Sequence, residues 1–112
     1  MKEFIAYLDR KISEGKAEII TLEADGRKDD ANFAKVRTNI YDVCRTVSRT
    51  LADRPGAGIS AVMAQLNRFR TAWSAALEKA KQHDDINAVA VEETKLAALE
   101  DIIAHFPEVT GA

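Results

Sequence analysis

The side chains of this sequence that could perform chemistry are few and scattered. Its two histidines are His83 and His105, and its single cysteine is Cys44. Asp101 and His105 are spaced i, i+4 and could share a metal ion on one helix face, but such a pair is common by chance on exposed helices. Di-iron bundles need Glu-x-x-His on paired helices, and the sequence contains no such motif. We therefore expect no metal, no cofactor and no enzymatic activity.

The sequence also lacks the motifs of nucleophilic catalysis and of phosphate binding. Cys44 lies beside the apolar stripe of its segment, and neither histidine falls in its layer, so we interpret it as a small, half-buried hydrophobe. Gly56-Ala57-Gly58 could bind an anion at a helix N-terminus, but the segment has neither the strand nor the Lys-Ser/Thr of a P-loop. Arg54-Pro55-Gly56-Ala57 fits a type II turn better, because proline fixes φ and glycine accepts a positive φ.

Glu92 is the residue whose type conflicts most with its position. It lies in the centre of an apolar stripe, between Val89 and Leu96, where a buried carboxylate needs hydrogen bonds or a cation. Counting from the turns places Gly15 and Trp73 in the same layer, with the missing side chain of Gly15 making room for the indole. Glu92 is then exposed at the edge of the bundle, part of a ligand site with Gly15 and Trp73, or paired with the Trp73 N–H, Lys16, Arg37 or Arg70.

These side chains are carried by four amphipathic segments. Apolar residues recur at spacings of three and four over residues 2–24, 30–52, 59–82 and 86–106, the pattern of helices that pack in a bundle. The 5 glycines and 2 prolines leave little material for the turns of a β protein. The stripe over 59–82 is the clearest: Ile59, Val62, Leu66, Phe69, Trp73, Ala76 and Ala80.

Three breaks separate the segments. Asp25-Gly26 ends the first helix with a glycine cap, and the turn over 54–57 ends the second. The third break has no glycine or proline, so one long helix is an alternative, but a two-residue slip of the apolar phase predicts a loop. Asp29 or Asp30 should cap the second helix, and Asp84 or Asp85 the fourth. Short loops make neighbours antiparallel, so we expect an all-α, antiparallel up-down-up-down four-helix bundle forming a single domain over residues 1–112.

The composition excludes several classes of protein. A formal net charge of −2 argues against generic nucleic-acid binding, which needs a basic surface. One cysteine cannot form an internal disulfide, and no apolar stretch approaches the roughly 18 residues that a membrane span needs. We expect a soluble, cytoplasmic protein with no membrane association.

Charge is unevenly distributed along the chain. Residues 35–70 carry seven basic side chains, six of them arginine, against two acidic ones, whereas residues 84–108 carry seven acidic side chains against Lys95 alone. Arginine favours bidentate contact with carboxylate or phosphate. This distribution predicts complementary packing between neighbouring helices, a docking surface for an acidic partner or a second copy, or, against the net charge, nucleic-acid binding. The candidate surface consists of Arg37, Arg45, Arg49, Arg68 and Arg70.

The last segment has a second apolar stripe, about a quarter-turn from the first, formed by Ala88, Val91, Ala98 and Ile102. Comparable apolar outliers elsewhere are Tyr7, Ile20 and Tyr41. A contiguous exposed patch of this kind would mark an interface. We therefore expect a non-enzymatic protein–protein interaction or assembly module that forms a homo-oligomer. The alternatives are a small-molecule or metal-binding bundle using the Gly15–Trp73–Glu92 layer, and an anion or nucleic-acid binder using the arginines.

Overall fold

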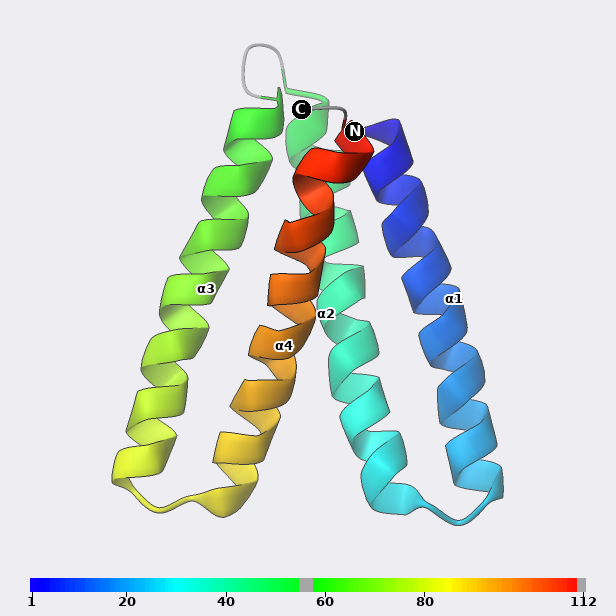
Figure 1. Cartoon of the computed structure of the whole chain (residues 1–112), viewed down its shortest axis with the longest axis vertical. Helices are drawn as coiled ribbons and strands as arrows, with labels where there is room; N and C mark the ends of the chain where they lie inside the picture. Colours follow the sequence, from blue (N-terminus) through cyan, green and yellow to red (C-terminus); the bar gives the residue numbers. More distant parts are fainter. Residues whose placement is uncertain (55–57, 111–112) are drawn as a thin grey trace.

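A computed structural model of the chain describes residues 1–54 and 58–110, with side chains as far as residue 106. Four helices make up almost all of it, and each runs antiparallel to the one before it (Figure 1). This confirms the predicted all-α, antiparallel four-helix architecture. The helices are α1 (Lys2–Ala24), α2 (Lys28–Ala52), α3 (Gly58–Gln82) and α4 (Ile86–Thr110).

Helices α1 and α3 end in the same way, although their sequences differ at this point. Each is followed by a residue in the left-handed region, Gly26 with φ 73° and Asp84 with φ 53°. The next N–H donates to the carbonyl five residues back, at 2.9 Å after Gly26 and 3.0 Å after Asp84, which is the Schellman arrangement. Helices α3 and α4 are therefore separate, and the alternative of one continuous helix is wrong. The predicted turn at 54–57 includes residues outside the described part of the chain.

One of the two predicted N-caps is present. The carboxylate of Asp85 accepts a hydrogen bond from the N–H of Ala88 at 3.1 Å, as expected for the start of α4. Helix α2 begins two residues earlier than predicted, with Arg27 at the cap position and no side-chain cap, so capping by Asp29 or Asp30 is wrong. Both acids lie in the first turn, where the helix dipole favours them, and Asp30 pairs with Arg27 at 2.6 Å.

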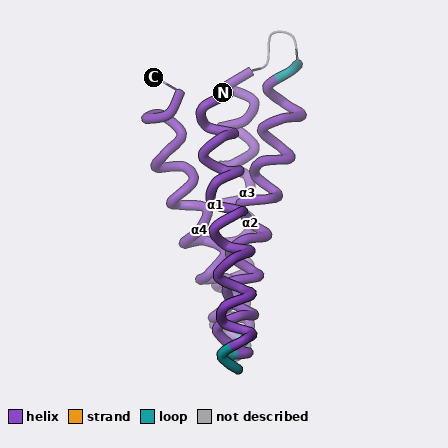
Figure 2. Tube along the Cα trace, turned by 90° about the vertical axis from the view of Figure 1, so that its right-hand side faces the viewer, coloured by secondary structure: helices purple, strands orange, loops and turns teal. Residues whose placement is uncertain are grey.

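The helices are arranged as two hairpins, α1–α2 and α3–α4, rather than at the corners of a square. Helices α2 and α4 contact each other between the hairpins, whereas α1 and α3 have no close approach within the described residues. The dimensions of the molecule are 45 × 35 × 20 Å. Figures 1 and 2 together show two layers of helices where α1 begins, but a single flat row where the α1–α2 and α3–α4 turns lie. We call these the closed end and the open end.

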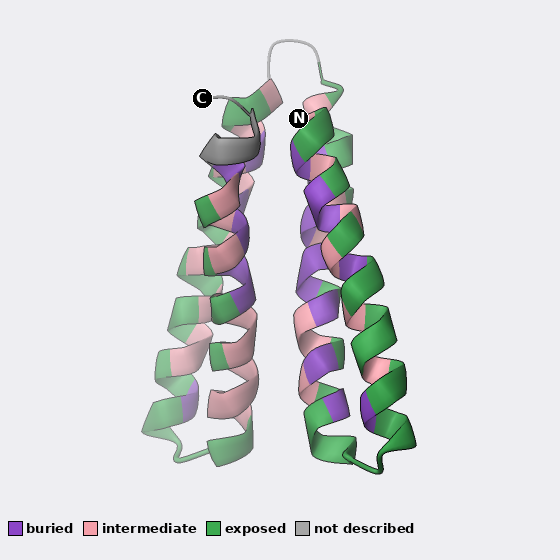
Figure 3. Cartoon of the chain, turned by 45° about the vertical axis from the view of Figure 1, so that its right-hand side comes forward, coloured by how far each residue is buried: buried purple, intermediate pink, exposed green. Residues whose placement is uncertain are grey.

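Burial differs between the two ends. The fully buried side chains of the main core lie toward the closed end: Phe4, Leu8, Val62, Leu66, Leu99 and Ile102. A small separate cluster of Leu22, Ala31 and Ala34 lies within the α1–α2 hairpin at the open end. Toward the open end, apolar residues of α2, α3 and α4 are only half-buried (Figure 3). They include Phe33, Val36, Trp73, Leu77, Val91 and Leu96.

Candidate functional site

Gly15 allows α1 and α2 to approach closely. A Cβ added at Gly15 would collide with the hydroxyl of Thr38, which donates to the carbonyl of Ala34 at 2.7 Å. The predicted contact between Gly15 and Trp73 is therefore wrong, since their helices α1 and α3 are not adjacent. Counting from the turns gives the height of a residue along the bundle, but not which helices are neighbours.

Glu92 and Trp73 do lie close together, and Lys95 joins them. The Nζ atom of Lys95 lies 3.4 and 3.3 Å from the two carboxylate oxygens of Glu92 and 4.7 Å from the centroid of the Trp73 ring. Both charged side chains are mostly buried, with 17% of Glu92 and 22% of Lys95 exposed. Oε2 of Glu92 is enclosed and accepts no hydrogen bond. Lys95 was not among the predicted partners of Glu92, because those lie on other helices, whereas Lys95 lies three residues along the same helix.

The predicted layer is therefore not assembled as a site. Glu92 and Trp73 lie between α3 and α4, whereas Gly15 faces Thr38 between α1 and α2. Arg37 and Arg70, predicted as possible partners of Glu92, pair instead with Glu18 and Glu100. Within the described part of the chain, no three His, Cys, Asp or Glu side chains are grouped so that they could hold a metal ion.

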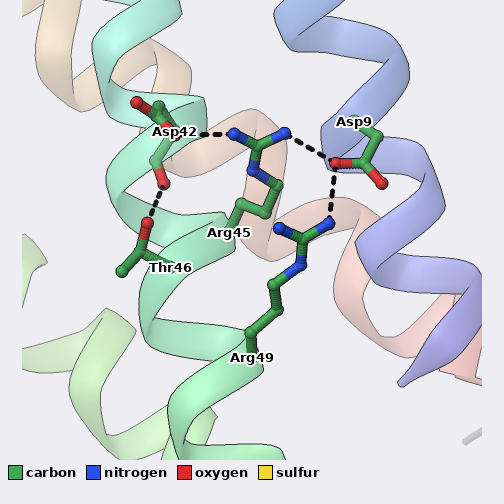
Figure 4. A network of polar contacts seen from close by, with 5 residues as sticks. All are labelled: Asp9, Asp42, Arg45, Thr46 and Arg49. Carbon is green, nitrogen blue, oxygen red and sulfur yellow. Dashed lines mark hydrogen bonds and ion pairs between the residues drawn. The ribbon is translucent and has the colours of Figure 1, made fainter.

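The candidate arginines are mostly paired with carboxylates of their own hairpin. Arg45 bridges Asp9 at 2.8 Å and Asp42 at 3.0 Å, and Arg49 reaches the same Asp9 oxygen at 3.4 Å (Figure 4). On the other hairpin, both nitrogens of the Arg70 fork bond Glu100 at 2.7 and 3.0 Å. The remaining two, Arg37 and Arg68, bond Glu18 at 2.8 Å and Gln65 at 3.3 Å. The five arginines are thus divided between α2 and α3, and four of them are already paired with a carboxylate.

Part of the second apolar stripe of α4 lies in the hydrophobic core. Ala98 and Ile102 are buried, with 3% and 0% exposed, so they cannot belong to an interface with another molecule. Ala88 and Val91 are half-buried, and they face pockets beside α3 and α2. The reason for the error is that α4 contacts α1 and α2 as well as α3, so it needs a wider apolar face than a helix with two neighbours.

A polar cluster missed by the sequence argument joins α1, α2 and α4. The hydroxyls of Tyr7 and Tyr41 both donate to Oδ2 of Asp101, each at 2.5 Å. Burial, followed by the hydrogen bond to Asp101 and its negative charge, raises the pKa of each tyrosine far above its ordinary value. Burial opposes ionisation of Asp101, but the hydrogen bonds from Tyr41 and Tyr7, helped by His105 and Lys11, outweigh it and lower its pKa.

His105 completes this cluster at the surface. Its Nδ1 lies 2.9 Å from the carbonyl oxygen of Asp101 and 3.5 Å from Oδ1. The imidazole stacks on the Tyr7 ring, with a centroid distance of 4.3 Å, and the neighbouring Phe4 and Phe106 rings meet edge to face at 4.9 Å. The spacing of Asp101 and His105 was visible in the sequence. The convergence of two tyrosines from different helices was not, because no local pattern encodes it.

The cluster cross-links helices of the two hairpins. Both tyrosine hydroxyls donate to Asp101, and the raised pKa of each keeps it protonated even at pH 10. Cys44 offers no alternative nucleophile, since burial raises the pKa of its thiol to about 12. We call Tyr7, Tyr41 and Asp101 the Asp101 junction, because it ties α4 of one hairpin to both helices of the other.

The open end has a different character. A pocket of about 350 Å³ lies between α2 and α4, with Phe33, Val36 and Val91 as its apolar lining and Asp29, Asn32 and Asn87 as its polar lining. Two large apolar side chains also lie exposed toward this end, Ile20 with 69% and Ile86 with 84% of their surface accessible. This region therefore combines a half-buried apolar face with two largely exposed isoleucines.

None of the helices, as far as the chain is described, has the length and apolar character needed to cross a membrane.

Comparisons with known proteins assign no function to these sites. No protein-family model, curated protein or solved structure matches the chain.

Proposed function

We propose that the protein is a non-enzymatic assembly module that self-associates through its open end. The observation that carries this proposal is the flat row of helices there, with apolar side chains of α2, α3 and α4 that are only half-buried. A stable fold normally buries its apolar stripes between two layers of secondary structure. A single row lacks the second layer, so another molecule that covers it would gain the apolar area that the chain alone leaves accessible.

A second copy of the chain is the occupant that these features favour. The faces of the two hairpins already pack on each other at the closed end, so the α2 face is complementary to the α3–α4 face. In a two-fold dimer, the α2 face of each copy would pack on the α3–α4 face of the other. The same surface would be buried on both copies, so the assembly would be complete as a dimer. The exposed Ile20 and Ile86 would extend the buried area. A net charge of only −2 gives little repulsion against such an association.

Analytical ultracentrifugation over a range of concentrations tests the proposal. We expect the wild-type protein to dimerise, and Val36→Glu combined with Val91→Glu to give a folded monomer, because both positions line the open-end pocket. Asn39→Glu with Ala97→Glu is the matched control, since these residues are exposed on the same two helices. Circular dichroism should show all three proteins to be helical. A wild-type protein that stays monomeric at the highest concentration would contradict self-association.

A further inference from the structure

The side-chain hydrogen bonds that join the two hairpins, as far as side chains are described, all end on one carboxylate. Tyr7 of α1 and Tyr41 of α2 both donate to Asp101 of α4. The ion pairs and other side-chain hydrogen bonds between helices lie within a hairpin: Lys35–Glu23, Arg37–Glu18, Arg45–Asp9, Arg49–Asp9 and Arg70–Glu100. The relative placement of the hairpins thus rests on apolar packing plus one polar junction.

The junction lies close to the place where the hairpins begin to diverge. On α4, the inward residues next to Asp101 are buried, namely Ala98, Leu99 and Ile102, whereas Val91 and Leu96, nearer the open end, are half-buried. The hydrophobic effect has no preferred direction, so apolar packing alone fixes the angle between the hairpins less sharply than hydrogen bonds do. Two short hydrogen bonds to one oxygen, from two different helices, have defined directions and oppose this motion.

We infer that Asp101 is a positioning residue that sets the angle between the hairpins and hence the shape of the open-end surface. Its effect on self-association rests on the proposed function, whereas its effect on the angle does not. The hydroxyls of Tyr7 on α1 and Tyr41 on α2 both hold Oδ2 of Asp101, so a movement of α4 away from either helix strains a hydrogen bond. The closed end therefore controls how far apart the open-end helices lie.

Asp9 is a natural control for Asp101. It is also a half-exposed carboxylate, with 43% of its side chain accessible against 37% for Asp101. It too accepts hydrogen bonds from two side chains, Arg45 and Arg49, but both donors lie on α2 of the same hairpin (Figure 4). Removal of Asp9 should therefore change stability without changing the angle between the hairpins.

The test measures the distance between spin labels attached to Lys28→Cys and Gln82→Cys, one on each hairpin beside its open-end turn. Both residues are exposed, and the native Cys44 is fully buried, with its pKa raised to about 12, so it should not react with the label. Pulsed electron paramagnetic resonance on dilute protein reports the distance within one molecule. The labels are introduced into wild type, Asp101→Ala, Tyr7→Phe/Tyr41→Phe, the triple variant with all three changes, and Asp9→Ala.

We expect a shifted and broader distance distribution in each variant that breaks the junction, and an unchanged one in Asp9→Ala. The triple variant leaves no unpaired hydroxyl, so it should regain stability relative to Asp101→Ala while keeping the altered distance. A merely structural role for Asp101 predicts the opposite, a distance that recovers with stability. If Asp101→Ala fails to fold, the Tyr7→Phe/Tyr41→Phe variant decides alone.

A folded Tyr7→Phe/Tyr41→Phe or Asp101→Ala protein with the wild-type distance distribution overturns the inference. Self-association is measured separately, and its dissociation constant should rise roughly tenfold in the junction variants but not in Asp9→Ala. If wild type does not associate, the proposed function fails, but the distance measurement still tests the junction. A changed distance with unchanged association supports the positioning role and contradicts the idea that association depends on the angle.

Discussion

The closed and open ends are built from the same four helices and the same spacing of apolar residues, yet they reach very different degrees of burial. Phe4, Leu66 and Ile102 are fully buried, whereas Phe33, Trp73 and Val91 remain half-buried. The difference lies in the arrangement of the helices, which form two layers at one end and a flat row at the other. An apolar stripe thus shows which face of a helix seeks a partner, but not whether the chain itself supplies it.

The largest expected loss of stability comes from a comparison of two phenylalanines, one at each end of the molecule. Phe4→Ala should destabilise the protein by about 3–5 kcal/mol, because it leaves a cavity in a filled core. Phe33→Ala should cost only about 1–2 kcal/mol in dilute solution, since its ring is already half-accessible. Urea denaturation measures both values. Equal costs at low concentration would remove the distinction between the two ends.

The variants Phe4→Ala and Phe33→Ala also test the proposal of self-association. If the open end binds a second copy, the folded state is stabilised at high protein concentration by mass action. The cost of Phe33→Ala should then grow with concentration, while that of Phe4→Ala, measured relative to wild type, should change little. A concentration-independent cost for Phe33→Ala would argue against Phe33 lying in an interface.

The second contrast concerns the two carboxylates. Asp101→Ala should cost about 2–3 kcal/mol, because it leaves two buried tyrosine hydroxyls without their acceptor. Asp9→Ala should cost about 1 kcal/mol or less, since its arginine partners can turn to water or, for Arg45, to Asp42. Denaturation midpoints measure both. If Asp9→Ala proved the more harmful, the Asp101 junction would not be the main polar tie of the fold.

The third contrast is between folded and unfolded tyrosine. The chain has 2 tyrosines, and both belong to the Asp101 junction, so tyrosine absorbance reports on this cluster alone. Both folded pKa values are raised above the ordinary value of 10.0. The stabilisation of the folded state by the two tyrosine hydroxyls is therefore complete below pH 10. It is lost as the pH rises above 10, because the tyrosines of the unfolded chain ionise first.

An alkaline titration followed by absorbance checks this prediction. The native protein should show no tyrosinate near pH 10, and tyrosinate should appear together with the loss of helical circular dichroism at higher pH. Protein unfolded in urea should titrate near pH 10. Tyrosinate that forms near pH 10 in the folded protein would mean that the hydroxyls are not held by Asp101.

Much of the fold followed from the sequence, because helices and their ends are encoded locally. The four stripes and Gly26 predicted helix bounds that agree closely with α1, α3 and the start of α4. The break at Asp84 was the weakest prediction, because aspartate there adopts the left-handed conformation that glycine usually supplies. Self-association stays a prediction.

The candidate sites were predicted less well, because they depend on which helices are neighbours. The contact of Gly15 with Trp73 failed once α1 and α3 proved not to be adjacent. Ile102 was placed in an interface and lies in the core, because α4 contacts three helices rather than two. Tyr7 and Tyr41 were recognised only as apolar outliers. Nothing in their spacing reveals that both reach Asp101, since residues distant in sequence converge there.

Gly15 gives a prediction in which the sign of the effect is informative. In an exposed helix, Gly→Ala is stabilising by about 0.5–1 kcal/mol. Here the added Cβ meets the Thr38 hydroxyl, so Gly15→Ala should instead destabilise by about 1–2 kcal/mol. Thr38→Ala should relieve most of that cost in a double-mutant cycle read by urea denaturation. A stabilising Gly15→Ala would contradict the close approach of α1 and α2 at Gly15 and Thr38.

The smallest expected effect compares the two turns of the open end. Asp84 and Gly26 occupy equivalent left-handed positions with the same backbone hydrogen bonds. Asp84→Gly should stabilise the protein by about 0.5 kcal/mol, because glycine adopts a positive φ without steric strain. This gain should exceed the cost of the greater conformational entropy that glycine loses on folding. Gly26→Asp is the reciprocal change and should cost about as much. Thermal denaturation of both variants at low concentration provides the measurement. Since neither turn contacts the Asp101 junction, the spin-label distance across the open end should stay unchanged in both, and a change in either would show that the turns, too, set the angle between the hairpins.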